Sequence, residues 1–127
     1  MQIKIMKLSQ CDAERFQIEF ASKYGTAKGI WRGVKPEIGK SYSVELDIPQ
    51  ILCWGTDIVE SDLKEPKIRC EKDKVLINAQ IERLENDGCL AARLGESIFL
   101  VETQGIPYTQ GTFIKMQPDQ ILLYRYL

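Results

Sequence analysis

Apolar and polar residues alternate along much of this chain. The segment SYSVELDI at 41–48 has apolar side chains at every second position, with Ser43, Glu45 and Asp47 between them. The segment KVLINAQIE at 74–82 follows the same period. A period of two is typical of a β-strand that buries one face and exposes the other. Both segments are therefore predicted to be strands of an antiparallel sheet.

Three further segments carry strand patterns. Residues 96–103 (ESIFLVET) form a short apolar run with polar ends, which predicts a strand covered on both faces. Residues 111–116 and 121–127 are predicted to be strands as well. Residues typical of turns separate the strands, as in KPEIGK at 35–40 and NDG at 86–88, where proline, glycine and Asp-Gly favour chain reversal.

These strands and turns predict a single all-β domain over residues 1–127. Several short strands separated by turns are typical of a sandwich or a barrel. A barrel is favoured because closure leaves few open strand edges in a chain of this length. The expected fold is one small barrel of about six to eight strands, like an OB or SH3 barrel, with at most one short helix.

Two segments fit more than one pattern. In residues 11–25 (CDAERFQIEFASKYG) the apolar positions fit both a strand and a helix. A helix would use Asp12 as its N-cap and Gly25 as its C-terminal stop, whereas the alternation from Phe16 onward indicates a strand, which we expect. Residues 56–67 (TDIVESDLKEPK) are expected to form either a short helix or an acidic loop.

Composition excludes several kinds of chemistry. The chain has 127 residues, a formal net charge of −1 and no histidine. Without histidine, Ser-His-Asp sites, Cys-His sites and H-E-x-x-H zinc sites cannot form within this chain. The four cysteines, at 11, 53, 70 and 89, include no C-x-x-C pair, so we expect buried or half-buried free thiols. We therefore expect no metal, no cofactor and no catalytic residue.

Charge and hydropathy also bear on location. A net charge close to zero gives no general attraction to nucleic acid or to a membrane surface. No apolar run approaches the roughly 20 residues that a membrane-spanning helix needs. The first ten residues, MQIKIMKLSQ, lack the apolar core of a secretion signal. The protein is accordingly expected to be cytoplasmic and not to associate with membranes.

A corner is predicted where the first alternating segment stops, in PQILCWGTDI at 49–58. Pro49 cannot donate a hydrogen bond to a strand ladder, and Gly55 permits a bend. Cys53 would be a nucleophile only beside a positive charge, but its nearest charged neighbour in the sequence is Asp57. The segment is therefore predicted to be structural.

Acidic residues cluster around this corner. Residues 41–65 contain six anions and one cation. The six carboxylates, with one tryptophan as an interface aromatic, define a predicted acidic face: Glu45, Asp47, Asp57, Glu60, Asp62, Glu65 and Trp54. Such a face suits a basic protein partner, because complementary charge speeds encounter and sets specificity, although a solvated loop would carry the same charges. The favoured function is a non-catalytic protein-binding module, such as an immunity-like or antitoxin-like inhibitor of a toxin or nuclease.

The alternative function is binding of single-stranded nucleic acid. Residues 21–40 contain five cations and one anion, with aromatic residues among and beside them. The candidate residues are Tyr24, Lys28, Trp31, Arg32, Lys35, Lys40 and Tyr42. Cations can follow phosphates while rings stack on bases, but the same rings could instead pack in the core. An enzyme based on carboxylates or a thiol comes third, because Glu45 and Asp47 share one exposed strand face where no division into acid and base is expected.

Overall fold

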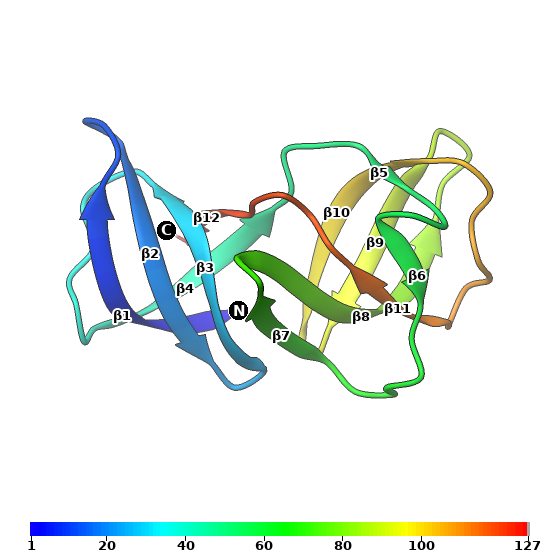
Figure 1. Ribbon diagram of the computed structural model, residues 1–127, viewed down its shortest axis with the longest axis horizontal. Coiled ribbons are helices and arrows are strands. Elements are labelled where there is room, and N and C mark those ends of the chain that lie inside the picture. Colours follow the sequence, from blue (N-terminus) through cyan, green and yellow to red (C-terminus); the bar gives the residue numbers. More distant parts are fainter. Residues whose placement is uncertain (127) are drawn as a thin grey trace.

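The computed structural model describes residues 1–126, which form twelve β-strands and no helix (Figure 1). The strands are β1 (Gln2–Gln10), β2 (Arg15–Ser22), β3 (Gly25–Arg32), β4 (Ser41–Asp47), β5 (Leu52–Cys53), β6 (Ile58–Glu60), β7 (Lys67–Glu71), β8 (Lys74–Leu84), β9 (Cys89–Leu94), β10 (Ser97–Gln104), β11 (Phe113–Met116) and β12 (Leu122–Arg125). The prediction of a small all-β barrel fold is confirmed. Strand β2 confirms the strand expected within residues 11–25, and residues 56–67 contain the short strand β6 and a loop.

The strands divide between two sheets that lie side by side (Figure 1). The first is a closed barrel with the order β1-β2-β3-β12-β4, in which β1 pairs with β4. The second is a seven-stranded sheet with the order β5-β10-β9-β8-β11-β6, in which β7 also pairs with β8. The structure has twelve strands where about six to eight were expected. Strands β5 and β6, with two and three residues, are too short to show an alternation, and β1, β3, β7 and β9 were not identified from the pattern.

Strand β12 completes the barrel after the chain has formed the second sheet, an arrangement that the sequence order alone does not suggest. The chain forms β1 to β4 in the barrel, then β5 to β11 in the second sheet, and returns as β12 between β3 and β4. Leu122 lies opposite Ile30 in the parallel pairing of β12 with β3. Buried residues of both sheets form one continuous apolar core. No single cut in the sequence therefore separates the barrel from the second sheet.

The alternating segments bury the faces that their patterns predict. Val44 in β4 is buried and Glu45 is exposed. In β8, Ile77 faces the core, but its neighbour Asn78 on the opposite face is also buried. The Asn78 side-chain amide donates hydrogen bonds to two carbonyl oxygens of the loop before β7, at 3.0 and 2.8 Å, so this loop covers the outer face of β8.

The turn between β2 and β3 joins the barrel to the second sheet. The carbonyl oxygen of Tyr24 accepts a hydrogen bond from the Ile68 N–H at 2.9 Å, and its hydroxyl accepts one from the Glu96 N–H at 3.0 Å. Lys23 Nζ lies 3.0 Å from a Glu96 carboxylate oxygen. Gly25 has a φ of 134° and lies so close to β7 that a Cβ would overlap the Ile68 carbonyl oxygen. Glycine is therefore required at this junction.

Strand β10 differs from the prediction of a strand covered on both faces, and that prediction is wrong. Phe99 and Val101 face the core and are 6% and 1% exposed. Ile98 and Leu100 point to the other face and are 50% and 58% exposed. An apolar run does not reveal whether a second layer covers each face, and here only one face of β10 is covered.

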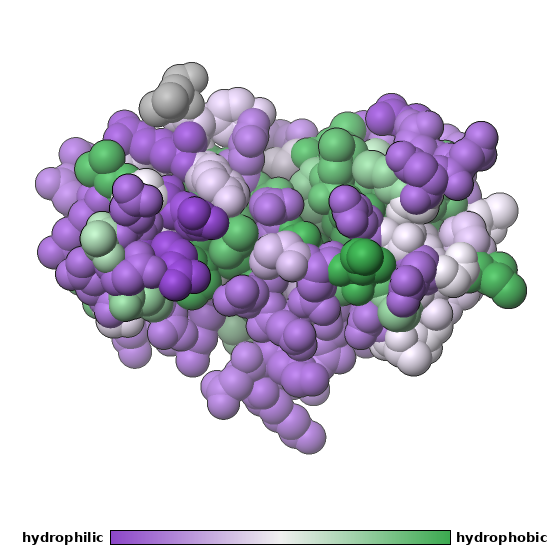
Figure 2. All heavy atoms as spheres, turned by 90° about the horizontal axis from the view of Figure 1, so that it is seen from above, coloured by the Kyte–Doolittle hydropathy of each residue, from purple (hydrophilic) through white to green (hydrophobic). Residues whose placement is uncertain are grey.

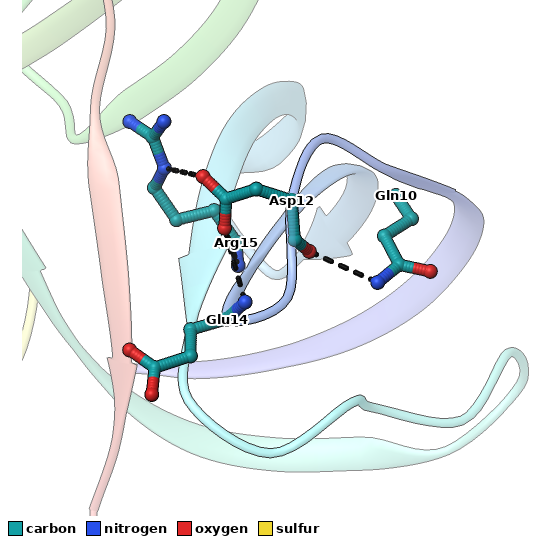
Figure 3. A network of polar contacts seen from close by, with 4 residues as sticks. All are labelled: Gln10, Asp12, Glu14 and Arg15. Carbon is teal, nitrogen blue, oxygen red and sulfur yellow. Dashed lines mark hydrogen bonds and ion pairs between the residues drawn. The ribbon is translucent and has the colours of Figure 1, made fainter.

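Asp12 organises the turn between β1 and β2 (Figure 3). Its Oδ1 accepts hydrogen bonds from the backbone N–H groups of Glu14 and Arg15, each at 3.0 Å, and its Oδ2 accepts one from Arg15 Nε at 2.6 Å. Gln10 Nε2 donates to the Asp12 carbonyl oxygen at 3.0 Å. Asp12 thus caps a turn, but a strand rather than a helix follows it.

We expect Asp12 to make stability depend on pH. Hydrogen bonds from the Glu14 N–H and the Arg15 side chain lower the pKa of the Asp12 carboxyl below its ordinary value. A group with a lowered folded-state pKa stabilises the fold above its unfolded pKa, and this stabilisation is lost as the pH falls through the folded pKa. The Asp12→Asn variant should therefore melt at a lower temperature than the wild type near neutral pH, and the difference should shrink in acid.

Thermal unfolding followed by circular dichroism at about pH 7 and about pH 2.5 checks this expectation. Asp119→Asn is the control, because the Asp119 carboxylate accepts no hydrogen bond within the part of the chain that the structure describes. A deficit of Asp12→Asn that grows in acid would contradict the assigned role.

Candidate functional site

Strand β10 has an open edge. On one side β10 pairs with β9 from Ser97 to Glu102, whereas on the other side β5 pairs only with Thr103 and Gln104. No other strand within residues 1–126 pairs with β10 on this second side. Positions 97–101 of β10 therefore form an edge that faces away from β9.

The direction of the backbone groups along this edge follows from the strand pairing. The Thr103 N–H donates to the Gly88 carbonyl on the β9 side, at 2.9 Å, and the Gln104 carbonyl accepts from the Trp54 N–H on the β5 side, at 3.0 Å. Each residue of a strand directs its N–H and its C=O to the same edge, and the next residue directs its two groups to the other edge. Ile98 and Leu100 therefore direct both backbone groups to the open edge, while their side chains lie on the exposed face.

A groove runs along this edge, between β10 and the outside of the barrel. It consists of two hollows of about 670 and 490 Å³, which share Asp47 and Leu100. We call it the β10 groove and define it by the lining residues Glu45, Leu46, Asp47, Ile51, Glu96, Ile98, Leu100, Glu102, Tyr124 and Tyr126. In the view from above, hydrophobic residues reach the surface near the middle of the molecule on the side of the second sheet, with hydrophilic residues around them (Figure 2).

The rim of the β10 groove is acidic. Four carboxylates line it, from Glu45, Asp47, Glu96 and Glu102. None of the described residues that line either hollow is a lysine or an arginine. Glu96 is paired with Lys23, but the other three have no ion pair among residues 1–126. The groove therefore combines an apolar floor with a net negative charge, which the N-terminal ammonium group of Met1 in the same hollow offsets only in part.

The structure divides the predicted acidic face into separate parts. Glu45 and Asp47 lie in the β10 groove. Glu60 and Asp62 line a different hollow of about 280 Å³, which three cations of β7 and β11 also line. Glu65 is exposed in the loop that follows. These carboxylates do not form one surface, because the chain passes from the barrel to the second sheet after Asp47.

The predicted corner before β6 is present, and two residues of the acidic face hold it in place. Asp57 Oδ2 accepts a hydrogen bond from the Cys53 N–H at 2.8 Å. Trp54 is half-buried, and its Nε1 donates to Thr103 Oγ1 at 2.9 Å. The Trp54 ring meets the Tyr108 ring edge-on, with centroids 5.4 Å apart. Asp57 and Trp54 are therefore engaged in contacts within the protein.

Two aromatic residues of the alternative nucleic-acid surface lie inside the barrel. Trp31 is 1% exposed and Tyr42 is 9% exposed, and their rings pack edge-on with centroids 5.1 Å apart. Trp31 Nε1 donates to the Val34 carbonyl at 2.8 Å, and the Tyr42 hydroxyl accepts from the Glu37 N–H at 2.9 Å. These rings are not accessible to bases, and Tyr24 is held at the junction of the sheets. Core packing is therefore the role of Trp31 and Tyr42.

The cations of the same set do not converge on a free groove. Lys28 is shared between two carboxylates, at 3.7 and 3.8 Å. Lys40 Nζ lies 2.8 Å from a Glu37 carboxylate oxygen. Arg32 and Lys35 are exposed. The basic stretch of the sequence is thus partly neutralised by local ion pairs.

The four cysteines are free. Cys53, Cys70 and Cys89 are half-buried, as expected, whereas Cys11 is exposed because it lies in the β1–β2 turn. Cys53 Sγ accepts a hydrogen bond from Gln104 Nε2 at 3.2 Å. Within residues 1–126, no group of three or more cysteine, aspartate or glutamate residues is placed to hold a metal ion, and no helix has the length and hydropathy of a membrane span.

Sequence reasoning missed the β10 half of the groove. The residues Ile98, Leu100 and Glu102 occupy alternate positions, as the outward face of a strand requires. This period was obscured because the intervening residues Phe99 and Val101 are apolar too. The groove also depends on β4 and β10 lying across from each other, although about fifty residues separate them in the chain.

Comparisons of the chain with protein-family models, with curated proteins and with solved structures each gave no match. The geometry and charge of the β10 groove are therefore the features that bear on function.

Proposed function

We propose that the protein is a non-catalytic binding module whose β10 groove receives a basic segment of another protein. The observation that carries this proposal is an exposed apolar floor inside a rim of four carboxylates, three of which form no ion pair among residues 1–126. Ile98 and Leu100 are each about half exposed, so covering both would contribute about 1.5–3 kcal/mol. Larger apolar patches with a polar rim are typical of interaction sites.

The charge of the rim specifies the chemistry of the partner. Three unpaired carboxylates disfavour an acidic or polyanionic partner and favour lysine or arginine side chains placed beside apolar ones. We propose more specifically that the protein inhibits a basic toxin or nuclease, whose positive charge would complement the acidic rim.

A labelled peptide of about seven residues with alternating lysine and leucine, measured by fluorescence anisotropy, tests the proposal. We expect it to bind the protein, whereas peptides with Lys→Glu or Leu→Ser replacements throughout should bind much more weakly. Reversing the charge of the rim in the triple variant Glu45→Lys, Asp47→Lys, Glu102→Lys should weaken binding on the order of tenfold or more.

A matched variant tests whether the position of the charges matters. Glu60→Lys, Asp62→Lys, Glu65→Lys changes the net charge by the same amount on exposed residues outside the groove. We expect this variant to bind the lysine-leucine peptide nearly as well as the wild type. Equal losses in the two triple variants would indicate general electrostatics. Tight, salt-sensitive binding of a single-stranded oligonucleotide instead of the peptide would favour the nucleic-acid alternative.

A further inference from the structure

We infer that the partner segment binds as an extended β-strand that adds to the open edge of β10; this inference rests on the proposed function. The first support is the set of unpaired backbone groups. Ile98 and Leu100 direct two N–H and two C=O groups into the groove, where no strand of the described chain pairs with them. An extended peptide can satisfy all four groups, as in other cases of strand addition.

The second support is that this edge carries no lysine, proline or bulge, although β4 of the barrel packs beside β10. Natural sheets protect their edges with lysine, proline, bulges or very short strands. Between Ser97 and Val101 the strand has neither lysine nor proline, and its pairing with β9 has no bulge. By contrast, the outer edge of β7 carries Lys67 and Arg69, and the turn before β3 covers it through the hydrogen bond from the Ile68 N–H.

The third support is the side-chain chemistry around the edge. A strand of five residues spans about 17 Å, so the edge from 97 to 101 accommodates a short linear motif. In antiparallel pairing, partner residues opposite Ile98 and Leu100 would place their side chains beside these two on the same face, where apolar residues fit. The alternate partner residues would carry the charges that complement Glu45 and Asp47 on the barrel side.

The same charges argue against a second copy of this chain as the occupant. Pairing of two β10 edges would bring two acidic rims together, each with Glu45, Asp47 and Glu102. Like charges placed in one interface disfavour association. A basic partner segment is therefore the occupant to which we commit.

Backbone N-methylation of the lysine-leucine peptide separates strand addition from simple occupation of the groove. One isomer is methylated on leucine residues and the other on the same number of lysine residues. The two isomers have the same composition and side chains, but each loses the N–H groups of only one edge. In antiparallel pairing the leucine N–H groups face β10, so the leucine-methylated isomer should bind on the order of tenfold more weakly than the lysine-methylated isomer.

A loss of affinity in only one of the two isomers supports strand addition. If the lysine-methylated isomer is the weaker binder, the peptide pairs parallel to β10 instead of antiparallel. Equal affinities of the two isomers overturn strand addition but leave the proposed function intact, provided that the unmethylated peptide binds and the rim variant does not. Absence of binding by the unmethylated peptide overturns both proposals.

A variant of the protein provides an independent measurement. Leu100→Pro removes an N–H that faces the open edge, not one that bonds to β9, and edge strands tolerate proline at such positions. Leu100→Ala is the matched control, because it removes the side chain but keeps the N–H. We expect Leu100→Pro to bind the peptide several-fold more weakly than Leu100→Ala, with both folded by circular dichroism. A dimer of the wild type that Leu100→Pro dissociates would overturn our choice of occupant.

Discussion

Replacing Gly25 with alanine is expected to lower the free energy of unfolding by about 3–5 kcal/mol. Two costs add at this position. The residue has a φ of 134°, which an L side chain rarely adopts, and its Cβ would overlap the Ile68 carbonyl oxygen at the junction of the two sheets. Because small domains are stable by about 5–15 kcal/mol, this change removes a large part of the total. Urea denaturation followed by circular dichroism measures it.

Gly39→Ala separates the two costs. Gly39 also has a positive φ, of 86°, but no atom lies within 4 Å of a Cβ built there. We expect a loss of about 1–2 kcal/mol for this variant, from the backbone conformation alone. Similar losses at the two glycines would show that the close approach of Gly25 to β7 is not important for stability.

The second large effect is expected at Trp31. Trp31→Ala should lower the free energy of unfolding by about 3–5 kcal/mol, because it leaves a cavity in the barrel core. It also removes the indole N–H that donates a hydrogen bond to the Val34 carbonyl oxygen. Trp54→Ala should cost less, about 1–2 kcal/mol, since Trp54 is only half-buried. Each variant keeps one tryptophan, so its fluorescence reports unfolding in the same denaturation experiment. A greater loss for Trp54→Ala would contradict the assignment of Trp31 to the core.

Local alternation predicted the strands whose two faces differ in polarity. Val44 and Glu45 are examples, since neighbouring residues in a strand point to opposite faces. The same rule explains the buried aromatic residues of the basic stretch. Trp31 directly precedes Arg32, so a strand that exposes the arginine must bury the tryptophan. A strand thus places an aromatic residue and the cation next to it in the sequence on opposite faces, so the two do not form one binding surface.

The division into two sheets and the β10 groove could not be predicted in the same way. Both depend on pairings between distant segments, such as β3 with β12, for which one sequence carries no local pattern. The acidic face is not one surface for a related reason: the chain leaves the barrel after Asp47, so Glu45 and Asp47 lie on the barrel whereas Glu60 lies on the second sheet. Glu45 and Asp47 remained together because they share one strand, and Glu60 and Asp62 line a second hollow.

The position of β12 has a consequence for the order of folding. Until this segment is available, β3 and β4 each lack a neighbour, and β1 to β4 form an open array with two unpaired margins. Pairing Leu122 with Ile30 closes a very long loop of the chain. This step is slow because the chain loses conformational entropy before the new strand contacts stabilise it. Barrel closure is therefore expected to follow assembly of the second sheet, and chains interrupted before β12 should be prone to aggregation.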